Sequence, residues 1–443
     1  MPGKTRGILH ETGTIPRSGK REEPRARLLR PLALLPQIPW FPLLKLDTES
    51  LAITLLLGML LGMIAISMDS TLPAMPAIQE SFLASASEVQ GVLGAVMLGF
   101  ITGQIAAGPL ADRFGRRPML IAALGVYCTA SLACALSASL WILCAARFAQ
   151  GCAAVFGPVL VRAIVRDLHA NEAAARLMGR VTMAFAILPI LMPLIGGSLV
   201  TWTGWRSIFW MHTLMAATLV AAVIAAIPET APAHRRGISL GRVLRDYLYL
   251  LGQKAFRAPT TLAVCSQMGV TAFVTNSALV AIPVLGLTPQ EYGMMFSLVM
   301  VGYISGARVG ARRVMRSGIP RMLNLGSIAA AMGGLLMAVL AIAGIQSSGA
   351  IAIPMALFMF GNGMLIPSTT AAALSPFPAL AGLASSLQSI IHLTGGLVLA
   401  FVLSLASNGT TLPLAAAIGL CGLAQLGLER YYARHRAFEP VHL

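Results

Sequence analysis

Asp69 is the one carboxylate that the sequence places inside an apolar run rather than at its end or in a loop. An aspartate at the middle of a membrane-spanning helix costs about 2.5–3.5 kcal/mol to insert, so its presence indicates a function. A carboxylate in a dry cavity favours its protonated form, and it can load and release a proton as its access to water changes. We therefore expect Asp69 to bind a proton or another cation. The alternative is a carboxylate near the outer membrane surface that caps the chain before Pro73.

Arg147 is a second charged residue within an apolar run, at about 140–165. An arginine does not lose its proton in a protein, so it needs a counter-charge, carbonyl groups or water. It either finds these groups inside the protein or extends towards the outer membrane surface. The sequence leaves open whether Arg147 reaches Asp69.

A charged turn separates the second and third apolar runs. It reads Gly-Pro-Leu-Ala-Asp-Arg-Phe-Gly-Arg-Arg-Pro over residues 108–118. Gly108 and Gly115 supply backbone freedom where the chain reverses. Short loops rich in arginine stay in the cytoplasm, so the turn is predicted to be inside, with Asp112 placed to accept hydrogen bonds from Arg116.

The composition is that of a polytopic membrane protein. Of the 443 residues, 57% are hydrophobic and 11% are charged, and the mean hydropathy is +0.78. A span needs roughly 20 apolar residues, so about a dozen fit after residue 51. The net charge of +16 lies in the tails and in alternate loops, as the positive-inside rule requires, and not in a nucleic-acid-binding patch. The six cysteines have no ligand spacing, so we predict neither a metal site nor a disulfide.

These spans predict an all-α membrane protein with 12 transmembrane helices. The expected divisions are a basic, disordered cytoplasmic tail (1–48), a bundle of helices 1–6 (49–228), a cytoplasmic linker (229–258), a bundle of helices 7–12 (259–430) and a cytoplasmic tail (431–443). Four of the expected membrane-spanning helices lie at about 51–72, 140–165, 293–309 and 322–344. The last two are separated by a predicted inner loop that carries Arg308, Arg312, Arg313, Arg316 and Arg321.

The charged turn resembles the G-x-L-a-D-r-x-G-r-r signature between helices 2 and 3 of the major facilitator superfamily. A weaker copy at 306–313 follows the eighth span and lacks an acid equivalent to Asp112. The resemblance implies two six-helix bundles with substrate bound between them near the membrane midplane. It also implies that the turn is a latch facing helix 11, whose opening favours the inward-open state; a solvated positive loop is the alternative. The residues expected to form the latch are Gly108, Asp112, Gly115, Arg116, Arg117, Arg166 and Asp167.

Further segments are similar to the Bcr/CflA drug-resistance branch of that superfamily. They are Met-Asp-Ser-Thr-Leu-Pro-Ala-Met-Pro at 68–76, Arg-Phe-Ala-Gln-Gly at 147–151, Arg-Ala-Ile-Val-Arg-Asp at 162–167, the helix 5 segment 188–197 and Trp-Arg-Ser-Ile-Phe at 205–209. The match implies that Arg147 takes part in proton coupling with Asp69. One departure is that residues 61–63 are apolar, whereas some relatives carry a second acid there.

The helix 5 segment resembles the antiporter motif, which would act as a seal and a bending point; ordinary close packing is the alternative. The residues concerned are Pro189, Pro193, Gly196 and Gly197. In the second half, four polar residues are candidates to line the substrate cavity, although each alone is better explained as a packing residue. These candidates are Asn276, Asn362, Gln388 and His392.

Together these features predict a proton-coupled antiporter that exports amphipathic drugs or toxic compounds across the bacterial inner membrane by alternating access, with both termini cytoplasmic. The expected partners are small-molecule drugs, protons and the lipid bilayer, with no nucleic acid, no cofactor and no obligate protein partner. A proton-coupled permease for a metabolite or nutrient is the alternative on the same fold. We do not expect an enzyme, because the sequence carries no acid pair, nucleophile or metal motif at one membrane depth.

Overall fold

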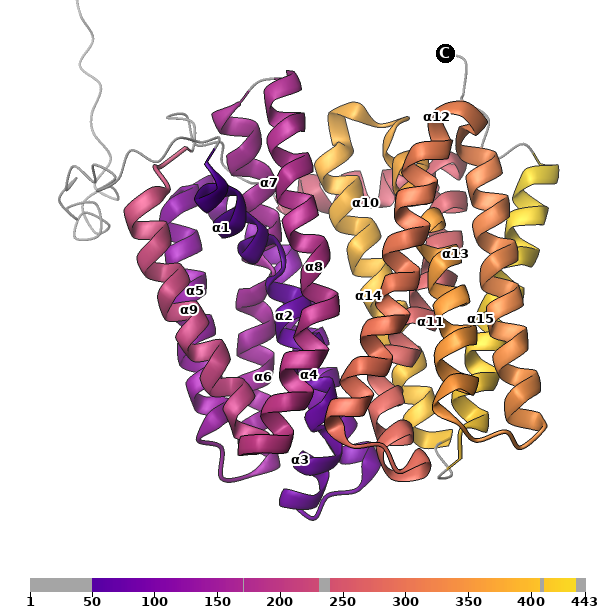
Figure 1. The fold of residues 1–443 in the computed structure, drawn as a ribbon. Coiled ribbons are helices and arrows are strands. Elements are labelled where there is room, and N and C mark those ends of the chain that lie inside the picture. Colours follow the sequence, from indigo (N-terminus) through magenta and orange to yellow (C-terminus); the bar gives the residue numbers. More distant parts are fainter. Residues whose placement is uncertain (1–49, 170, 231–239, 407–409, 436–443) are drawn as a thin grey trace, which may run out of the picture. The chain divides into compact units, whose positions relative to one another are not determined.

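The computed structural model describes residues 50–169, 171–230, 240–406 and 410–435. The predicted N-terminal tail, 1–48, therefore lies outside the described residues. Within these ranges every regular element is a helix (Figure 1). Ten helices are long and apolar enough to cross a membrane, and a bent pair at the N-terminal end of the described chain adds an eleventh span.

The first span is broken, whereas the sequence predicted one helix over 51–72. Helix α1 (Leu51–Leu61) stops at Gly62, and α2 (Met63–Asp69) follows; the bend between α1 and the helical segment Met63–Ser81 is 56°. Gly62 lies against the side chain of Leu188, so that a side chain here would collide with the neighbouring helix. The short elements η3 (Leu72–Ala74) and α3 (Met75–Ser81) then lead to the next span. The break makes Asp69 the last residue of a helix rather than a mid-helix residue.

The remaining helices of the first half pack as neighbouring pairs, mainly α4 on α6 and α5 on α9. The predicted fourth span is two helices that meet at Val155. The six elements are α4 (Ala86–Phe114), α5 (Arg116–Ala135), α6 (Leu140–Ala154), α7 (Phe156–Leu168), α8 (Asn171–Thr203) and α9 (Arg206–Ala226). Gly99 and Gly103 let α4 approach the backbone of α6, because both lie directly against α6 main-chain atoms.

Helix α12 (Pro289–Ile342) has 54 residues. At 1.5 Å per residue such a helix is about 80 Å long, far more than the roughly 30 Å of a hydrocarbon core. Its path is interrupted at Gly318, which has a φ of 76° that favours glycine. The element thus holds two of the expected spans, which is consistent with twelve in total. The predicted inner loop from Arg308 to Arg321 is helical instead, apart from the non-helical backbone at Gly318.

The rest of the second half adds four spans and one short helix. These elements are α10 (Leu240–Gly252), α11 (Lys254–Leu285), α13 (Ser348–Leu374), α14 (Ala381–Ala406) and α15 (Leu412–Arg434), with the single turn η4 (Pro378–Leu380) before α14. Helix α10 occupies part of the predicted linker, and its 13 residues are too few to span a membrane. Its Leu250 is buried with Phe256 of α11 and Ala384 of α14, which fixes α10 against the second half.

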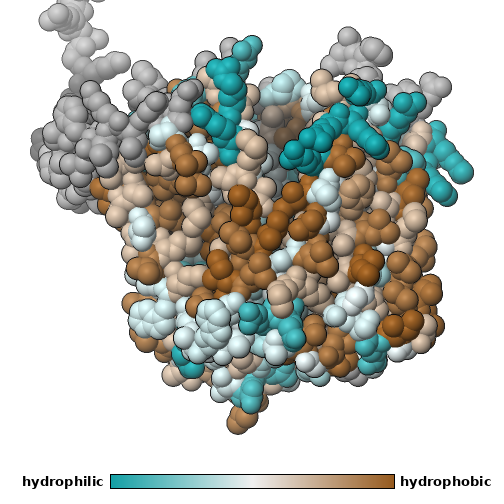
Figure 2. Space-filling model, in the orientation of Figure 1, coloured by the Kyte–Doolittle hydropathy of each residue, from teal (hydrophilic) through white to brown (hydrophobic). Residues whose placement is uncertain are grey.

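An apolar band crosses the middle of the face shown in Figure 2, and most hydrophilic side chains in view gather at one end. Exposed arginines lie at the turn after α4, at the end of α7 and beside Gly318 in α12; they include Arg113, Arg166, Arg312 and Arg316. We call this the basic end. This band is the pattern expected of a protein whose solvent is lipid along its sides and water at its ends.

The two halves meet at the end opposite the basic end. Ser297 of α12 donates a hydrogen bond to the carbonyl of Ile190 in α8 (2.7 Å). Gln90 of α4 donates to the side-chain oxygen of Asn276 in α11. Gly293 of α12 also lies directly against the α8 backbone. These contacts hold the halves together away from the basic end.

We predict that Gly103→Ala destabilises the protein by about 1–3 kcal/mol, because the added methyl group overlaps the Cys152 carbonyl and forces α4 from α6. Gly125→Ala is the control, since no atom lies within 4 Å of a methyl group added there. Thermal unfolding of the detergent-solubilised protein measures both. Equal melting temperatures for the two variants would contradict the close approach at Gly103.

Candidate functional site

A cavity of about 560 Å³ lies between the two halves. Helices α1, α2, α4, α7 and α8 line it from the first half, and α11 to α14 line it from the second. Its polar lining consists of Asp69, Arg162, Thr182, Gln267, Thr271 and Tyr303. Methionines and phenylalanines cover much of the remainder, and they include Met68, Met97, Met300, Phe100, Phe185 and Phe296. Large flexible apolar side chains with few polar groups suit amphipathic molecules of varied shape.

Asp69 faces this cavity and is half-buried. It is the only acid among the described residues of the lining, and no hydrogen bond or ion pair is found for it in the described part of the chain. The cap before Pro73, the alternative role, is not found in the described residues, because no side chain accepts a hydrogen bond at the start of η3. A carboxyl group without a fixed partner, facing a cavity, is free to exchange a proton or meet a ligand.

Arg147 is completely buried and does not extend to the membrane surface. Its Nη1 atom donates to the Ser67 carbonyl (3.0 Å) and to Oε1 of Gln150 (2.6 Å). The ring centroid of Phe209 lies 5.7 Å from the guanidinium carbon. No ion pair joins Arg147 to a described acid, Asp69 included. Arg147 thus binds α2 through the carbonyl two residues before Asp69, and carbonyl and ring dipoles replace a counter-charge.

Sequence reasoning missed two residues of this buried cluster. Gln150 joins Arg147 to Ser131 of α5, because its Nε2 atom donates to the Ser131 hydroxyl (2.7 Å). His212 of α9 contacts both Gln150 and Ser70. Gln150 belongs to the Arg-Phe-Ala-Gln-Gly segment, so the motif contained that signal. His212 is an ionisable residue in an otherwise apolar run, which was the signal available for it.

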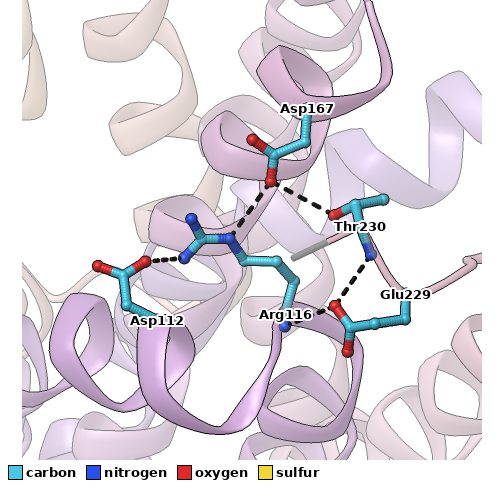
Figure 3. A network of polar contacts seen from close by, with 5 residues as sticks. All are labelled: Asp112, Arg116, Asp167, Glu229 and Thr230. Atoms are coloured by element: carbon cyan, nitrogen blue, oxygen red, sulfur yellow. Dashed lines mark hydrogen bonds and ion pairs between the residues drawn. The ribbon is translucent and has the colours of Figure 1, made fainter. Parts of the chain in front are cut away.

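The charged turn forms a network centred on Arg116 (Figure 3). Its guanidinium group pairs with Asp112 (2.5 Å) and with Asp167 at the end of α7 (3.4 Å). Its backbone N–H donates to Glu229 (3.0 Å), which follows α9. Thr230 closes the network by donating to both Glu229 (2.9 Å) and Asp167 (3.4 Å). The turn therefore ties three inner segments of the first half together.

Other expected latch residues lie apart from this network or at its edge. Arg117 donates to the carbonyl of Ile224 near the α9 C-terminus (2.6 Å). Gly115 has a φ of 104° and lies against Glu229, so only glycine fits there without strain. Arg166 is exposed, and no contact with Arg116 is found. Glu229 was missed because it lies 113 residues from its partner.

The implied contact with helix 11, which is α14, is not made in this structure. The Asp112 side chain is 51% exposed, and its one partner among the described residues is Arg116. Gly108 faces open space, because nothing lies within 4 Å of a methyl group added there. Both observations agree with the contacts between the halves described above, which lie away from the basic end.

The predicted antiporter motif lies at the contact between the halves. Pro189 lines the cavity, and the Pro193 carbonyl lies against Gly293 of α12. Gly196 lies directly against the backbone of Ser70, next to Asp69. Gly197 lies against the backbone of α12 at Pro289. These small residues let α8 contact both the end of α2 and the α12 helix of the other half.

None of the four polar candidates in the second half is among the described residues that line the cavity. Asn276 and Asn362 are buried and bonded to Gln90 and Ser266. Gln388 is buried too, and His392 is half-buried on the same helix. The polar lining of that half is supplied instead by Gln267, Thr271 and Tyr303. The periodicity of these apolar helices is too weak to tell the cavity face from a packed face.

Glu429 corrects the expectation that Asp69 is the only acid within a span. Helix α15 continues to Arg434, which places Glu429 inside it rather than at its end. Glu429 is buried, with 3% of its surface exposed, and it accepts a hydrogen bond from Asn324 (3.0 Å). It packs within the second half, away from the cavity lining.

We predict that Arg116→Gln lowers the free energy of unfolding by about 1–3 kcal/mol, because Asp167 and Asp112 both lose a charged partner. The control is Arg113→Gln, which removes an exposed guanidinium whose described contact is the ring of Phe114. A surface change of this kind stays within about 0.5 kcal/mol. Thermal unfolding in detergent compares the two, and equal losses would show that the network adds no stability.

Comparison with known proteins agrees with this geometry. Residues 55–400 match the family model described as Major Facilitator Superfamily. Multidrug resistance protein D of Escherichia coli (strain K12) is 31% identical over 312 residues, covering 70% of this chain and 78% of that protein. The Bicyclomycin resistance protein homolog of Haemophilus influenzae is 29% identical over 370 residues, covering 83% of this chain and 92% of that protein.

Solved structures share the fold at low identity. The crystal structure of a D-xylose-proton symporter superimposes with a TM-score of 0.67 at 16% identity, covering 85% of this chain and 96% of that one. The inward open conformation of the xylose transporter XylE from E. coli gives a TM-score of 0.67 at 15% identity, covering 85% of this chain and 95% of that one. The chain is therefore a member of the Major Facilitator Superfamily, with curated relatives of the Bcr/CflA type at about 30% identity.

Proposed function

We propose that this protein is a proton-coupled antiporter that exports amphipathic drugs across the bacterial inner membrane. The observation that supports this most directly is the cavity between the halves, where a single acid, Asp69, faces walls rich in methionine and phenylalanine. The names of the relatives, which refer to multidrug and bicyclomycin resistance, favour the same substrates.

The structure corresponds to the inward-open state of this transporter. By the positive-inside rule the basic end faces the cytoplasm. The halves touch at the opposite end through Pro193, Gly197 and the Ser297–Ile190 hydrogen bond. The antiporter motif is thus the outer seal, and the unlatched turn at Asp112 leaves the cytoplasmic end open.

In the proposed cycle a drug enters the cavity from the cytoplasm, and Asp69 releases its proton to the same side. The two bundles, 49–228 and 259–430, then rock about the outer seal, and the Arg116 network meets α14 as the inner end closes. Asp69 takes up a proton from the outside as the drug leaves. Arg147 keeps a fixed positive charge behind α2 throughout, because its hydrogen bonds hold it to Ser67 and Gln150.

A proton-coupled permease for a metabolite is less well supported. Sugars and similar nutrients need many fixed hydrogen-bond partners. The lining here offers six polar residues among 24. The direction of transport in membrane vesicles separates the two, since a permease accumulates substrate in the direction of the proton gradient and an antiporter moves it in the opposite direction.

We predict that Asp69→Asn abolishes drug resistance in an efflux-deficient bacterium, because the amide neither loads nor releases a proton. Growth inhibition across a drug panel measures this, with membrane expression matched by immunoblot. Glu80→Gln is the control, since Glu80 is an exposed acid of α3 outside the cavity. Resistance that survives Asp69→Asn would move the coupling site elsewhere, and the lack of resistance from the unmodified protein would favour the permease.

With one acid in the cavity, we predict exchange of one proton per drug. One charge that crosses 100 mV gains about 2.3 kcal/mol, and every 1.4 kcal/mol is about tenfold in concentration. Membrane potential should therefore drive export of neutral substrates and leave export of monovalent cations unaffected, because the latter exchange moves no net charge. Transport in proteoliposomes with imposed potassium-diffusion potentials measures both, and equal potential dependence of the two classes would contradict one-proton coupling.

A further inference from the structure

A chain of buried hydrogen bonds runs from Arg147 to the end of the helix that carries Asp69, and His212 is its central member. The His212 ring lies between α2 and α6, with Nε2 at 2.8 Å from Oγ of Ser70 and Nδ1 at 3.2 Å from Nε2 of Gln150. Both neighbours and the ring itself are completely buried, so no surface water takes part.

The orientation of the Gln150 amide follows from Arg147. A guanidinium group only donates hydrogen bonds, so the amide atom 2.6 Å from Arg147 Nη1 must be the oxygen. The amide nitrogen therefore faces the Ser131 hydroxyl at 2.7 Å and His212. Ser131 donates its own proton to the Tyr127 carbonyl (2.7 Å), which leaves its oxygen to accept from Gln150. The remaining amide hydrogen points at Nδ1 of His212, and that atom must accept it.

On the other side of the ring, the imidazole nitrogen donates a hydrogen bond instead of accepting one. Ser70 donates its hydroxyl proton to the Ile66 carbonyl (2.7 Å), so its oxygen accepts from His212. Nε2 of His212 therefore carries a proton and Nδ1 does not. A cationic ring would place a second donor against the amide hydrogens of Gln150, beside the fixed charge of Arg147.

From this polarity we infer that His212 is a positioning residue, held as the neutral Nε2–H tautomer, that ties the Asp69 end of α2 to Gln150 and Arg147. Ser70 is held from two sides, by the hydrogen bond to His212 and by the close contact with Gly196 of α8. The segment that carries Asp69 thus moves together with the Arg147 cluster or breaks this bond. The inference about transport rests on the proposed function, whereas the tautomer does not.

The ionisable groups around His212 are few. Arg147 is the charged group of α6 in the same cluster, and Tyr127 of α5 has its ring centroid 6.0 Å from that of His212. On α2 the nearest acid in sequence is Asp69, which adjoins Ser70 and faces the cavity instead. On α9 itself, Phe209 stacks edge-on against the imidazole. Within the described residues, Arg147 therefore sets which atoms donate and which accept in this series of hydrogen bonds.

The tautomer is tested by nitrogen NMR of the full chain labelled with ¹⁵N-histidine in nanodiscs. The protein has seven histidines, and the His212 signals are those missing from His212→Asn. We expect a protonated Nε2 and an unprotonated Nδ1. Gln150→Glu is the matched change, because a carboxylate has no donor for Nδ1, and the ring should then carry a proton on Nδ1. A protonated Nδ1 in the unmodified protein, or no change in Gln150→Glu, overturns the assignment.

The positioning role is tested by exchange of ethidium for protons in proteoliposomes. Ser70→Ala and His212→Asn each remove the bond to α2, and we expect turnover to fall about tenfold, the effect of one buried hydrogen bond, with KM within about twofold. The double variant should be no slower than either single one. Additive losses, or turnover equal to that of the unmodified protein, overturn the role. If the unmodified protein exchanges no ethidium, the proposed substrate class fails, and the NMR result still decides the tautomer.

Discussion

The burial of one permanent cation, Arg147, is the constraint on which the first half of this protein depends. An arginine in a low-dielectric interior must be stabilised by a counter-charge or by dipoles. Here dipoles do so, because the Ser67 carbonyl and the Gln150 amide accept from it and Phe209 presents its ring. These groups come from three helices, so the cation joins α2, α6 and α9 into one unit. Among the described residues Asp69 has no ion-pair partner, and it faces the cavity.

Close backbone contact is the second constraint, and glycine supplies it. Lipid tails are as apolar as the helices, so helices in a membrane associate through tight packing and through hydrogen bonds. Gly103 lets α4 pack closely on α6, whereas Gly196 and Gly197 let α8 pack closely on the end of α2 and on α12. Main-chain atoms therefore make up part of the contact between the halves, beside the side-chain hydrogen bond from Gln90 to Asn276. In the proposed cycle the bundles pivot at this contact.

The Arg116 network is built differently, because it lies at the basic end, where the Asp112 side chain is 51% exposed. Arg116 binds Asp112, Asp167 and Glu229, and all of these belong to the first half. The network stabilises one surface of the first half and leaves the Asp112 side chain exposed. Under the proposed function this carboxylate is available to the other bundle when the inner end closes. An ionic surface suits this place, since exposed charges pair and separate at little cost.

The sequence by itself determined the membrane class, the helical fold, the family resemblance and the basic end, and it singled out Asp69 as a candidate site residue, because apolar runs, arginine placement and motif spacing are local properties. Only the tertiary structure decided which residues of different helices are in contact. The break at Gly62, the pairing of Glu229 with Arg116, the position of His212 between Ser70 and Gln150, and the cavity residues Gln267 and Tyr303 all depend on helices that are distant in sequence. Membrane helices that are apolar on every side carry little periodic signal, so the face that meets a cavity is set by packing with neighbours and cannot be read from one helix alone.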